Sequence, residues 1–136
     1  MIFLDTNVLS EAMRIAPDAR VMRWLGALGE RGSVSTVVLA ELRFGIERIR
    51  PSERAPRLAN VLAELVHGYA GRIHGFDLDA AFIYGEIMGK ASRAGRPMQA
   101  PDGMIAAISL RHKAELATRN VRDFEALGVT VVNPWE

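Results

Sequence analysis

Asp5 is the residue whose type and position most directly suggest chemistry. It ends the apolar run of residues 1–4, which is typical of a short buried strand, and Thr6 and Asn7 follow it. Residues just after the strands of a parallel sheet lie at the edge where ligands bind. A carboxylate there is costly to desolvate without a partner, so Asp5 indicates metal binding or acid chemistry. The alternative is that Asp5 only caps a helix, because Asp, Thr and Asn all favour helix starts.

Three further polar residues occupy comparable positions. Glu41 lies about one turn into a helix predicted after the second strand; Asp102 starts a later helix, and Asn120 follows a later strand. Because strand ends and the following helix starts share one edge of an open parallel sheet, these side chains could converge with Asp5. Simpler explanations exist, since Asp102 and Asn120 could be helix caps and Glu41 a solvated helix residue.

Converging carboxylates restrict the kind of site. Several within about 4–6 Å of one another repel unless some are protonated or a cation intervenes. No nearby Lys or Arg offers each acid a dedicated partner, whereas Mg²⁺ and Mn²⁺ prefer carboxylate and water oxygens. His67, His74 and His112 fall outside these positions and the chain has no Cys, which argues against zinc and against histidine or thiol catalysis.

Length and hydrophobic patterning predict the elements that must position these residues. The 136 residues suit one domain spanning 1–136. Short apolar segments alternate with helical patterns, which predicts an α/β layered fold with a mainly parallel sheet. Strands are expected at residues 2–5, 34–38, 72–76, 115–118 and 129–132. Helices are expected around residues 24–28, 38–49, 58–66, 80–88 and 104–110.

The overall composition is that of an ordinary globular protein, with 49% hydrophobic and 24% charged residues. The net charge of +1 creates no global field for nucleic acid, although all but Lys90 and Lys113 of the 17 basic residues are Arg. Arg binds phosphate in a fork that Lys cannot copy, and a coding bias is the alternative explanation. The N-terminus lacks signal-peptide features and no apolar run approaches the roughly 20 residues that cross a bilayer, so we expect a cytoplasmic protein.

Four motifs occur together in an order that resembles the PIN-domain ribonucleases, specifically the VapC toxins of bacterial toxin–antitoxin modules with their FitB-like branch. The resemblance spans essentially the whole chain. It implies a PIN-like three-layer α/β fold with a mainly parallel five-stranded sheet flanked by helices. The motifs are Asp5-Thr6-Asn7, Ala40-Glu41-Leu42-x-x-Gly45, Asp102-Gly103-x-Ile105-Ala106-Ala107 and Ala117-Thr118-Arg119-Asn120-x-x-Asp123-Phe124, and the chain closes on Asn133-Pro134-Trp135.

The resemblance implies a metal-dependent endoribonuclease that hydrolyses RNA phosphodiester bonds and inhibits translation or growth until its antitoxin blocks it. Asp5 and Asp102 would hold Mg²⁺ or Mn²⁺, and Glu41 would orient the attacking water or help to bind a second ion. Asn120 stands where many family members carry Asp, which puts the second ion in question, and Asp123 could supplement it. Polar residues expected to line the site are Thr6 and Thr118; arginines expected to grip the RNA backbone are Arg43, Arg48, Arg50, Arg93, Arg96, Arg119 and Arg122.

The resemblance also implies partners. The substrate would be transfer or ribosomal RNA. The protein would form a homodimer, and a heterotetramer or larger assembly with a VapB-type antitoxin, which alone would contact operator DNA. The apolar helices around residues 37–49 and 58–66 are candidate contact surfaces. Two alternative functions are a non-catalytic RNA- or protein-binding module of the same fold and a haloacid-dehalogenase-like phosphatase, which needs a second acid where Asn7 stands.

Overall fold

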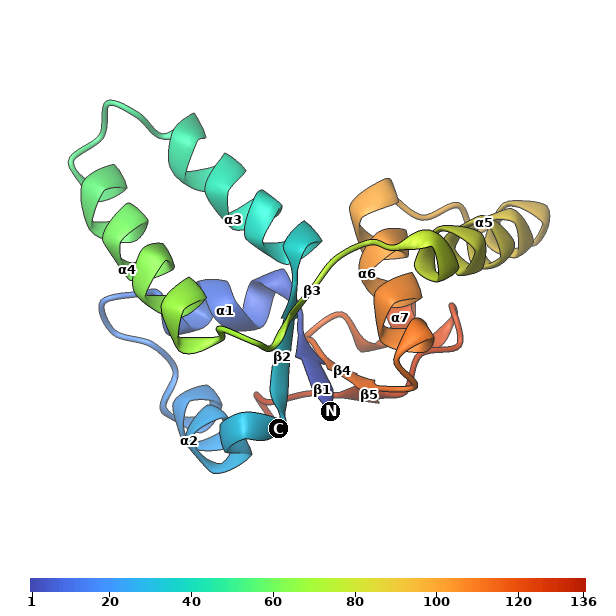
Figure 1. Ribbon diagram of the computed structural model, residues 1–136, viewed down its shortest axis with the longest axis horizontal. Coiled ribbons are helices and arrows are strands. Elements are labelled where there is room, and N and C mark those ends of the chain that lie inside the picture. Colours follow the sequence, from blue (N-terminus) through green and yellow to red (C-terminus); the bar gives the residue numbers. More distant parts are fainter.

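Five parallel strands form one sheet in the computed structural model, which describes residues 1–136 (Figure 1). The strand order β3-β2-β1-β4-β5 places β1 at the centre, and every neighbouring pair is parallel. This arrangement confirms the predicted α/β fold. The strands are β1 (Ile2–Leu4), β2 (Gly32–Ser35), β3 (Ile73–His74), β4 (Glu115–Ala117) and β5 (Val131–Val132).

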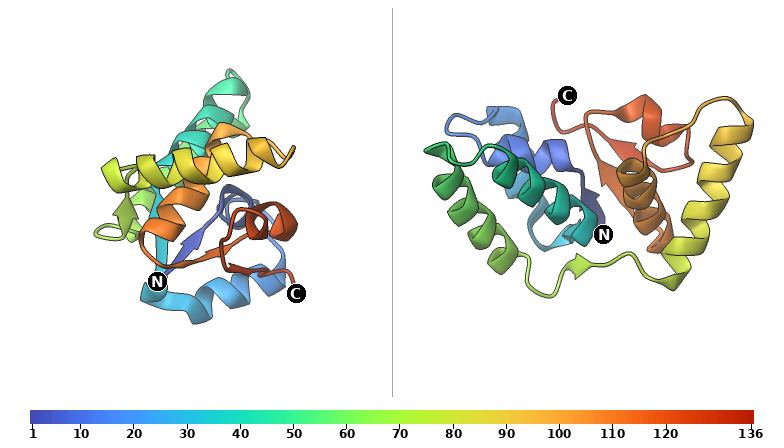
Figure 2. Two further views of the ribbon diagram at one scale, coloured as in Figure 1. Left: turned by 90° about the vertical axis from the view of Figure 1, so that its right-hand side faces the viewer. Right: turned by 90° about the horizontal axis from the view of Figure 1, so that it is seen from above.

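Helices cover both faces of this sheet and complete three layers. The chain moves one way across the sheet from β1 to β3 and the opposite way from β4 to β5. Right-handed crossovers therefore place the two sets of connecting helices on opposite faces, as Figure 2 shows. One set is α1 (Thr6–Ala12), α2 (Ala19–Leu28), α3 (Thr36–Arg48) and α4 (Arg54–Gly68); the other is α5 (Leu78–Arg93), α6 (Ala100–Arg111) and α7 (Val121–Glu125).

The hydrophobic core lies where the central strands meet α1, α3 and α6. The strand residues Phe3, Leu4 and Leu116 are buried, which explains why the strands appear as continuous apolar runs. In α6 the consecutive residues Ile105 and Ala106 are both buried, because this helix is enclosed rather than lying on the surface. The rigid centre of the molecule thus lies directly beneath the carboxyl ends of β1 and β4.

The second strand was predicted to extend over residues 34–38, and this boundary is wrong. The strand ends at Ser35, whose hydroxyl accepts a hydrogen bond from the backbone N–H of Val38 at 3.2 Å. This cap starts α3, so Val37 and Val38 lie in a helix although β-branched residues are common in strands. The earlier helix start brings Glu41 into the second turn of α3.

Two short helices, α1 and α7, were not among the five that the patterning predicted. α1 has seven residues and α7 has five, too few to show a helical period clearly. Both begin at residues next to the predicted site, after Asp5 and Asn120. None of the helices combines the length and the apolar character that crossing a bilayer requires.

Candidate metal-dependent active site

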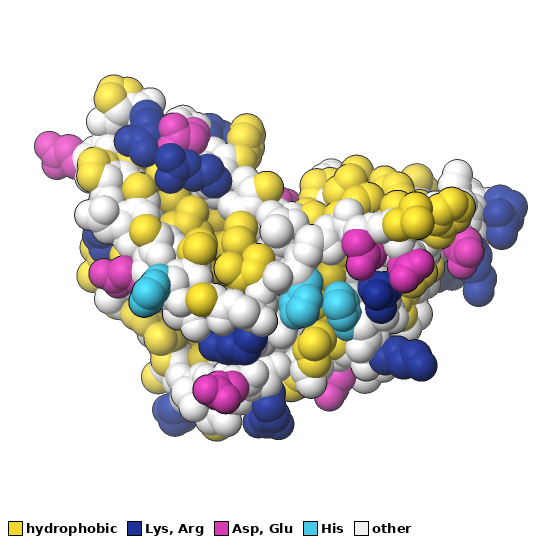
Figure 3. All heavy atoms as spheres, in the orientation of Figure 1, with side chains coloured by type: hydrophobic (Ala, Val, Ile, Leu, Met, Phe, Trp, Pro, Cys, Tyr) yellow, Lys and Arg dark blue, Asp and Glu magenta, His cyan; other side chains and the backbone are white.

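The candidate site lies at the point where the strand order reverses. β1 and β4 are neighbours at the centre of the sheet, and the chain leaves them toward opposite faces. In open α/β sheets, the crevice beyond the carboxyl ends of two such strands is where ligands bind. The surface is hollowed between the arm formed by α3 and α4 and the arm formed by α5 and α6 (Figure 3).

Asp5 is buried at this point, with only 3% of its surface exposed. One carboxylate oxygen accepts the backbone N–H of Thr6 at 2.8 Å, and the other accepts the hydroxyl of Thr118 at 2.7 Å. Burial raises the pKa of Asp5 to about 6, the two hydrogen bonds oppose this rise, and the charges of Asp102 and Glu41 add to it. Asp5 therefore caps α1, as the simpler explanation predicted, but capping engages only one of its two oxygens.

The side chain of Glu41 is hydrogen-bonded to the start of α1 and does not lie on a solvated helix face. It is half-buried on α3, and the hydroxyl of Thr6 donates to its Oε1 at 2.6 Å. Since Thr6 directly follows Asp5, this contact fixes the Glu41 carboxylate next to that of Asp5. In the sequence, Glu41 interrupts an otherwise apolar stretch of the helix, and its partial burial agrees with that pattern; its catalytic role stays a prediction.

Asp102 approaches from the opposite arm. It is the third residue of α6, whose cap position is Gln99, so its interpretation as a helix cap is wrong. Burial raises the pKa of Asp102, and the negative charges of Glu41 and Asp123 raise it further. A Cβ on the next residue, Gly103, would lie 2.5 Å from Met88 Sδ, so close packing of α5 fixes this turn of α6.

Asn120 and Asp123 complete the rim on the side of β4. The backbone N–H of Asn120 donates to the Thr118 hydroxyl oxygen at 3.0 Å, which places this residue one contact away from Asp5. Asn120 occupies the cap position of α7, but its side chain makes no capping hydrogen bond and is exposed. The charge of Asp123, an exposed residue of α7, acts on Asp102, so Asp123 lies within electrostatic range of the site.

Asn7 belongs to the same network and was not predicted to have a role there. Its side-chain amide donates to the Thr118 hydroxyl oxygen at 3.3 Å, and its oxygen accepts the backbone N–H of Arg119 at 3.3 Å. Asn7 thereby joins α1 to the loop after β4. In the sequence, Asn7 looked like part of a helix start, and the only further signal was its place in the Asp5-Thr6-Asn7 motif.

The protein supplies no cation to balance these acids. Six Arg–carboxylate contacts form ion pairs in the structure, and none of them involves Asp5, Glu41 or Asp102. The three carboxylates are close enough for their charges to interact. No three acidic or histidine side chains, however, lie close enough together to enclose one metal ion by themselves.

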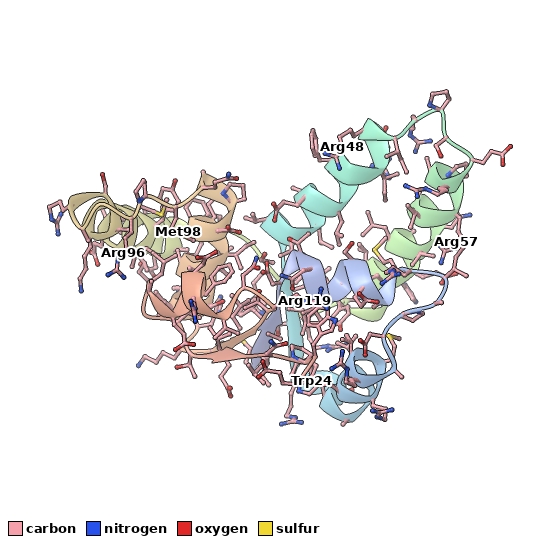
Figure 4. All side chains as sticks on the ribbon, turned by 180° about the vertical axis from the view of Figure 1, so that it is seen from behind. Trp24, Arg48, Arg57, Arg96, Met98 and Arg119 are labelled. Atoms are coloured by element: carbon pink, nitrogen blue, oxygen red, sulfur yellow. The ribbon has the colours of Figure 1, made fainter.

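The arginines predicted to flank the site differ in whether they form ion pairs with carboxylates. Arg43 and Arg50 both pair with Glu47, at 3.4 and 3.0 Å, whereas Arg48 forms no ion pair. Figure 4 shows Arg48 on the α3 arm, Arg96 on the opposite arm and Arg119 between the two arms. Arg48 lines both pockets beside the site and is free to contact a ligand in the hollow, whereas the Arg119 guanidinium lies 4.0 Å from the centre of the Trp135 ring.

Two pockets adjoin the acids. One of about 690 Å³ lies between α1, α3 and α4, and one of about 480 Å³ lies between α3 and Pro101 at the start of α6. Both open onto the site, because they share four lining residues: Thr6, Glu41, Gly45 and Arg48.

Comparison with known proteins places the chain in a family. It matches the family model of the PIN domain over residues 2–129. It is 40% identical to VapC ribonuclease Y4jK of Sinorhizobium fredii, across 100% of this chain and 99% of that protein. It is 39% identical to Toxin FitB of Neisseria gonorrhoeae, across 99% of each.

Solved structures agree with this assignment. The crystal structure of FitAcB from Neisseria gonorrhoeae contains a chain with a TM-score of 0.91 and 38% identity, covering 100% of this chain and 99% of that one. DNA-bound VapBC from Salmonella typhimurium gives a TM-score of 0.86 at 25% identity, covering 98% and 97%. This chain belongs to the PIN-domain family, alongside the VapC and FitB proteins.

Proposed function

We propose that this protein is a metal-dependent endoribonuclease and the toxin of a toxin–antitoxin pair. The observation that carries the proposal is the approach of Asp5, Glu41 and Asp102, from three different elements, without any cationic partner. Relatives that match this chain over nearly their whole length are named as VapC ribonucleases or endonucleases, which supports the reaction class.

The chemistry of the donor set fits Mg²⁺ or Mn²⁺. Every candidate ligand is a carboxylate or amide oxygen, the hard donors that these ions prefer. Asp5 and Asp102 would hold the ion, with water and substrate phosphate oxygens completing its shell, as is usual for Mg²⁺. When bound, it would neutralise the carboxylates and supply Lewis-acid chemistry at the phosphate.

The chain's own residues orient this chemistry. Thr118 and the backbone of Thr6 each engage one oxygen of Asp5, which fixes the carboxylate plane. Glu41, oriented in turn by the Thr6 hydroxyl, would direct the attacking water or contribute to a second ion site. Asn120 and Asp123, after β4, would offer further oxygen ligands to such a second ion.

The pocket between α1, α3 and α4 suits the antitoxin partner. Seven of its 15 lining residues are hydrophobic and four are arginines, and it leads to Thr6 and Glu41, so a peptide lying in it would reach the acids. We place a segment of a VapB-type antitoxin there, blocking access to RNA. Several structures of related chains are toxin–antitoxin complexes, some with DNA, which supports this partner and operator contact through it. We also propose a homodimer, which becomes a heterotetramer or a larger assembly with antitoxin, and transfer or ribosomal RNA as substrate.

Cleavage of purified cellular RNA tests the proposal. Wild-type protein should cut RNA with Mn²⁺ or Mg²⁺ and lose activity in a chelator. Asp5→Asn and Asp102→Asn should each reduce cleavage by at least roughly 100-fold, since each removes a charged ligand. Asp79→Asn is the matched control, because Asp79 is an exposed acid at the start of α5, paired with Arg111 outside the site. Cleavage that persists in the chelator, or in folded Asp5→Asn protein, would overturn the assignment.

A further inference from the structure

Phe44 is a large apolar side chain that the core does not use, and it lies beside the acids. It is 65% exposed, whereas Leu42 and Ile46 on the same helix are buried. Phe44 follows Glu41 by three residues on α3, about 5 Å along the helix axis. Both residues line the 480 Å³ pocket together with Thr6. The ring is therefore a wall of the proposed active-site cleft rather than an isolated surface residue.

Arg48 adds a positive charge to this wall. Its guanidinium lies 5.6 Å from the centre of the Phe44 ring, and it lines both pockets next to the site. Arg43 and Arg50 on the same surface are held by Glu47, but Arg48 has no carboxylate partner. Figure 4 shows it on the arm that borders the hollow. An aromatic face combined with a free cation is the arrangement that holds bases and phosphates of single-stranded nucleic acid.

Gly45 leaves open space at the same place. A Cβ on this residue would meet no atom within 4 Å, so the packing of the protein does not require glycine there. Glycine in a helix interior lowers helix stability relative to alanine. Its presence between Phe44 and Arg48, in the lining of both pockets, is consistent with a surface that a ligand approaches closely.

We propose that Phe44 and Arg48 form a stacking site for an unpaired nucleobase next to the cleaved phosphodiester, an inference that rests on the proposed ribonuclease function. The base would stack on the Phe44 ring, and Arg48 would contact the phosphate of the same nucleotide. Bases inside a duplex have no free face for such contact. Phe44 and Arg48 would therefore engage only a nucleotide that is unpaired in the RNA.

The experiment uses one short RNA, single-stranded or annealed to its complement, with 2-aminopurine placed beside the cleavage position. Binding is followed in a chelator by quenching of the 2-aminopurine fluorescence, and cleavage is followed separately with Mn²⁺. Phe44→Ala should weaken single-strand binding and raise KM by roughly 5- to 150-fold, and should abolish the quenching. Phe44→Trp should keep both close to wild type, whereas Phe44→Leu should behave like Phe44→Ala, because stacking needs an aromatic face.

Phe82→Ala is the matched control, since Phe82 is 67% exposed on α5 and does not line either pocket. Unchanged KM and quenching in Phe44→Ala, or full function in Phe44→Leu, would overturn the stacking site even if wild-type protein cleaves RNA. Loss of a dimer in Phe44→Ala, seen by light scattering, would assign the ring to a protein contact instead. Failure of wild-type protein to cleave, with quenching intact, would overturn the nuclease proposal alone.

Discussion

The hydroxyl of Thr118 donates a hydrogen bond to Oδ2 of Asp5 at 2.7 Å, which joins residues at opposite ends of the chain. The same hydroxyl oxygen accepts hydrogen bonds from the Asn7 side chain and the Asn120 backbone. Thr118 is fully buried, so water cannot replace these contacts. Its position is what holds the central acid in one orientation.

Replacing Thr118 by Val should weaken metal binding without disturbing the shape of the core. The change removes the hydroxyl and leaves one buried oxygen of Asp5 unsatisfied. We expect the affinity for Mn²⁺ to fall by roughly 10- to 100-fold and the free energy of unfolding to fall by about 1–3 kcal/mol. Titration calorimetry measures the first and chemical denaturation the second. Thr118→Ser, which keeps the hydroxyl, should stay near wild type; equal affinities in all three proteins would contradict the role given to Thr118.

Metal-free protein should become more stable when Asp5 is replaced by Asn. Burial raises the pKa of Asp5 to about 6 from an ordinary value near 3.8, so the folded state resists ionisation. Below pH 4 Asp5 is protonated in both the folded and the unfolded state and does not affect stability. The free energy of unfolding falls as the pH rises from 4 to 6, because Asp5 ionises more readily in the unfolded state, and it stays lower at pH 7.5. In a chelator, Asp5→Asn should therefore raise Tm by several degrees at pH 7.5 and by much less at pH 4.

Added Mn²⁺ should reverse the order of these two proteins. Wild-type Tm should rise with Mn²⁺ at pH 7.5, because an ion that binds only the folded state stabilises it. Asp5→Asn should show little response. A wild-type protein whose Tm ignores Mn²⁺, or a variant that responds equally, would be incompatible with a metal at Asp5.

Salt dependence should separate Arg48 from its neighbours on α3. If Arg48 contacts phosphate, Arg48→Ala should reduce the slope of log affinity against log salt for single-stranded RNA by about 0.7. Arg43→Ala is the matched control. The guanidinium of Arg43 already pairs with Glu47, so its removal should leave the slope nearly unchanged. Fluorescence anisotropy in a chelator at several salt concentrations gives both slopes, and identical slopes would remove Arg48 from the binding surface.

Changing Asn120 to Asp should favour a second ion. The side chain is exposed beside Thr118 and makes no hydrogen bond that the change would break. A new carboxylate beside Thr118, which contacts Asp5, would add a charged ligand where the wild-type chain offers a neutral one. Calorimetry with Mn²⁺ should show a second binding event or a clear gain in affinity in Asn120→Asp, and neither in the surface control Asn60→Asp.

The sequence predicted the sheet well because buried parallel strands are continuous apolar runs. It could not define where β2 ends, since Val37 and Val38 favour strands by type but lie in a helix that Ser35 caps. It also missed α1 and α7, which are too short to show a period. Side-chain caps at Asp5 and Ser35 set two of these boundaries; both residue types favour helix starts, but the apolar patterning did not resolve where the strand gives way to the helix. The start of α7 has no side-chain cap.

The site was predicted from topology rather than from local signals. Asp5, Glu41 and Asp102 each had a simpler explanation, and only their expected place at one sheet edge argued for convergence. Two parts of the network depended on tertiary contacts: the Thr6 hydroxyl on Glu41, and Asn7 linked to the loop after β4. Neither has a sequence spacing that a pattern could detect, since the partners are 35 and 111 residues apart.

The hydrogen bond between Thr118 and Asp5 also sets a time at which the site can exist. Asp5 and Thr118 are 113 residues apart, so a ribosome must add all the intervening residues after Asp5 before this contact can form and the pocket can be assembled. Until then, the nascent polypeptide has no hydroxyl to hold the Asp5 carboxylate in its final orientation.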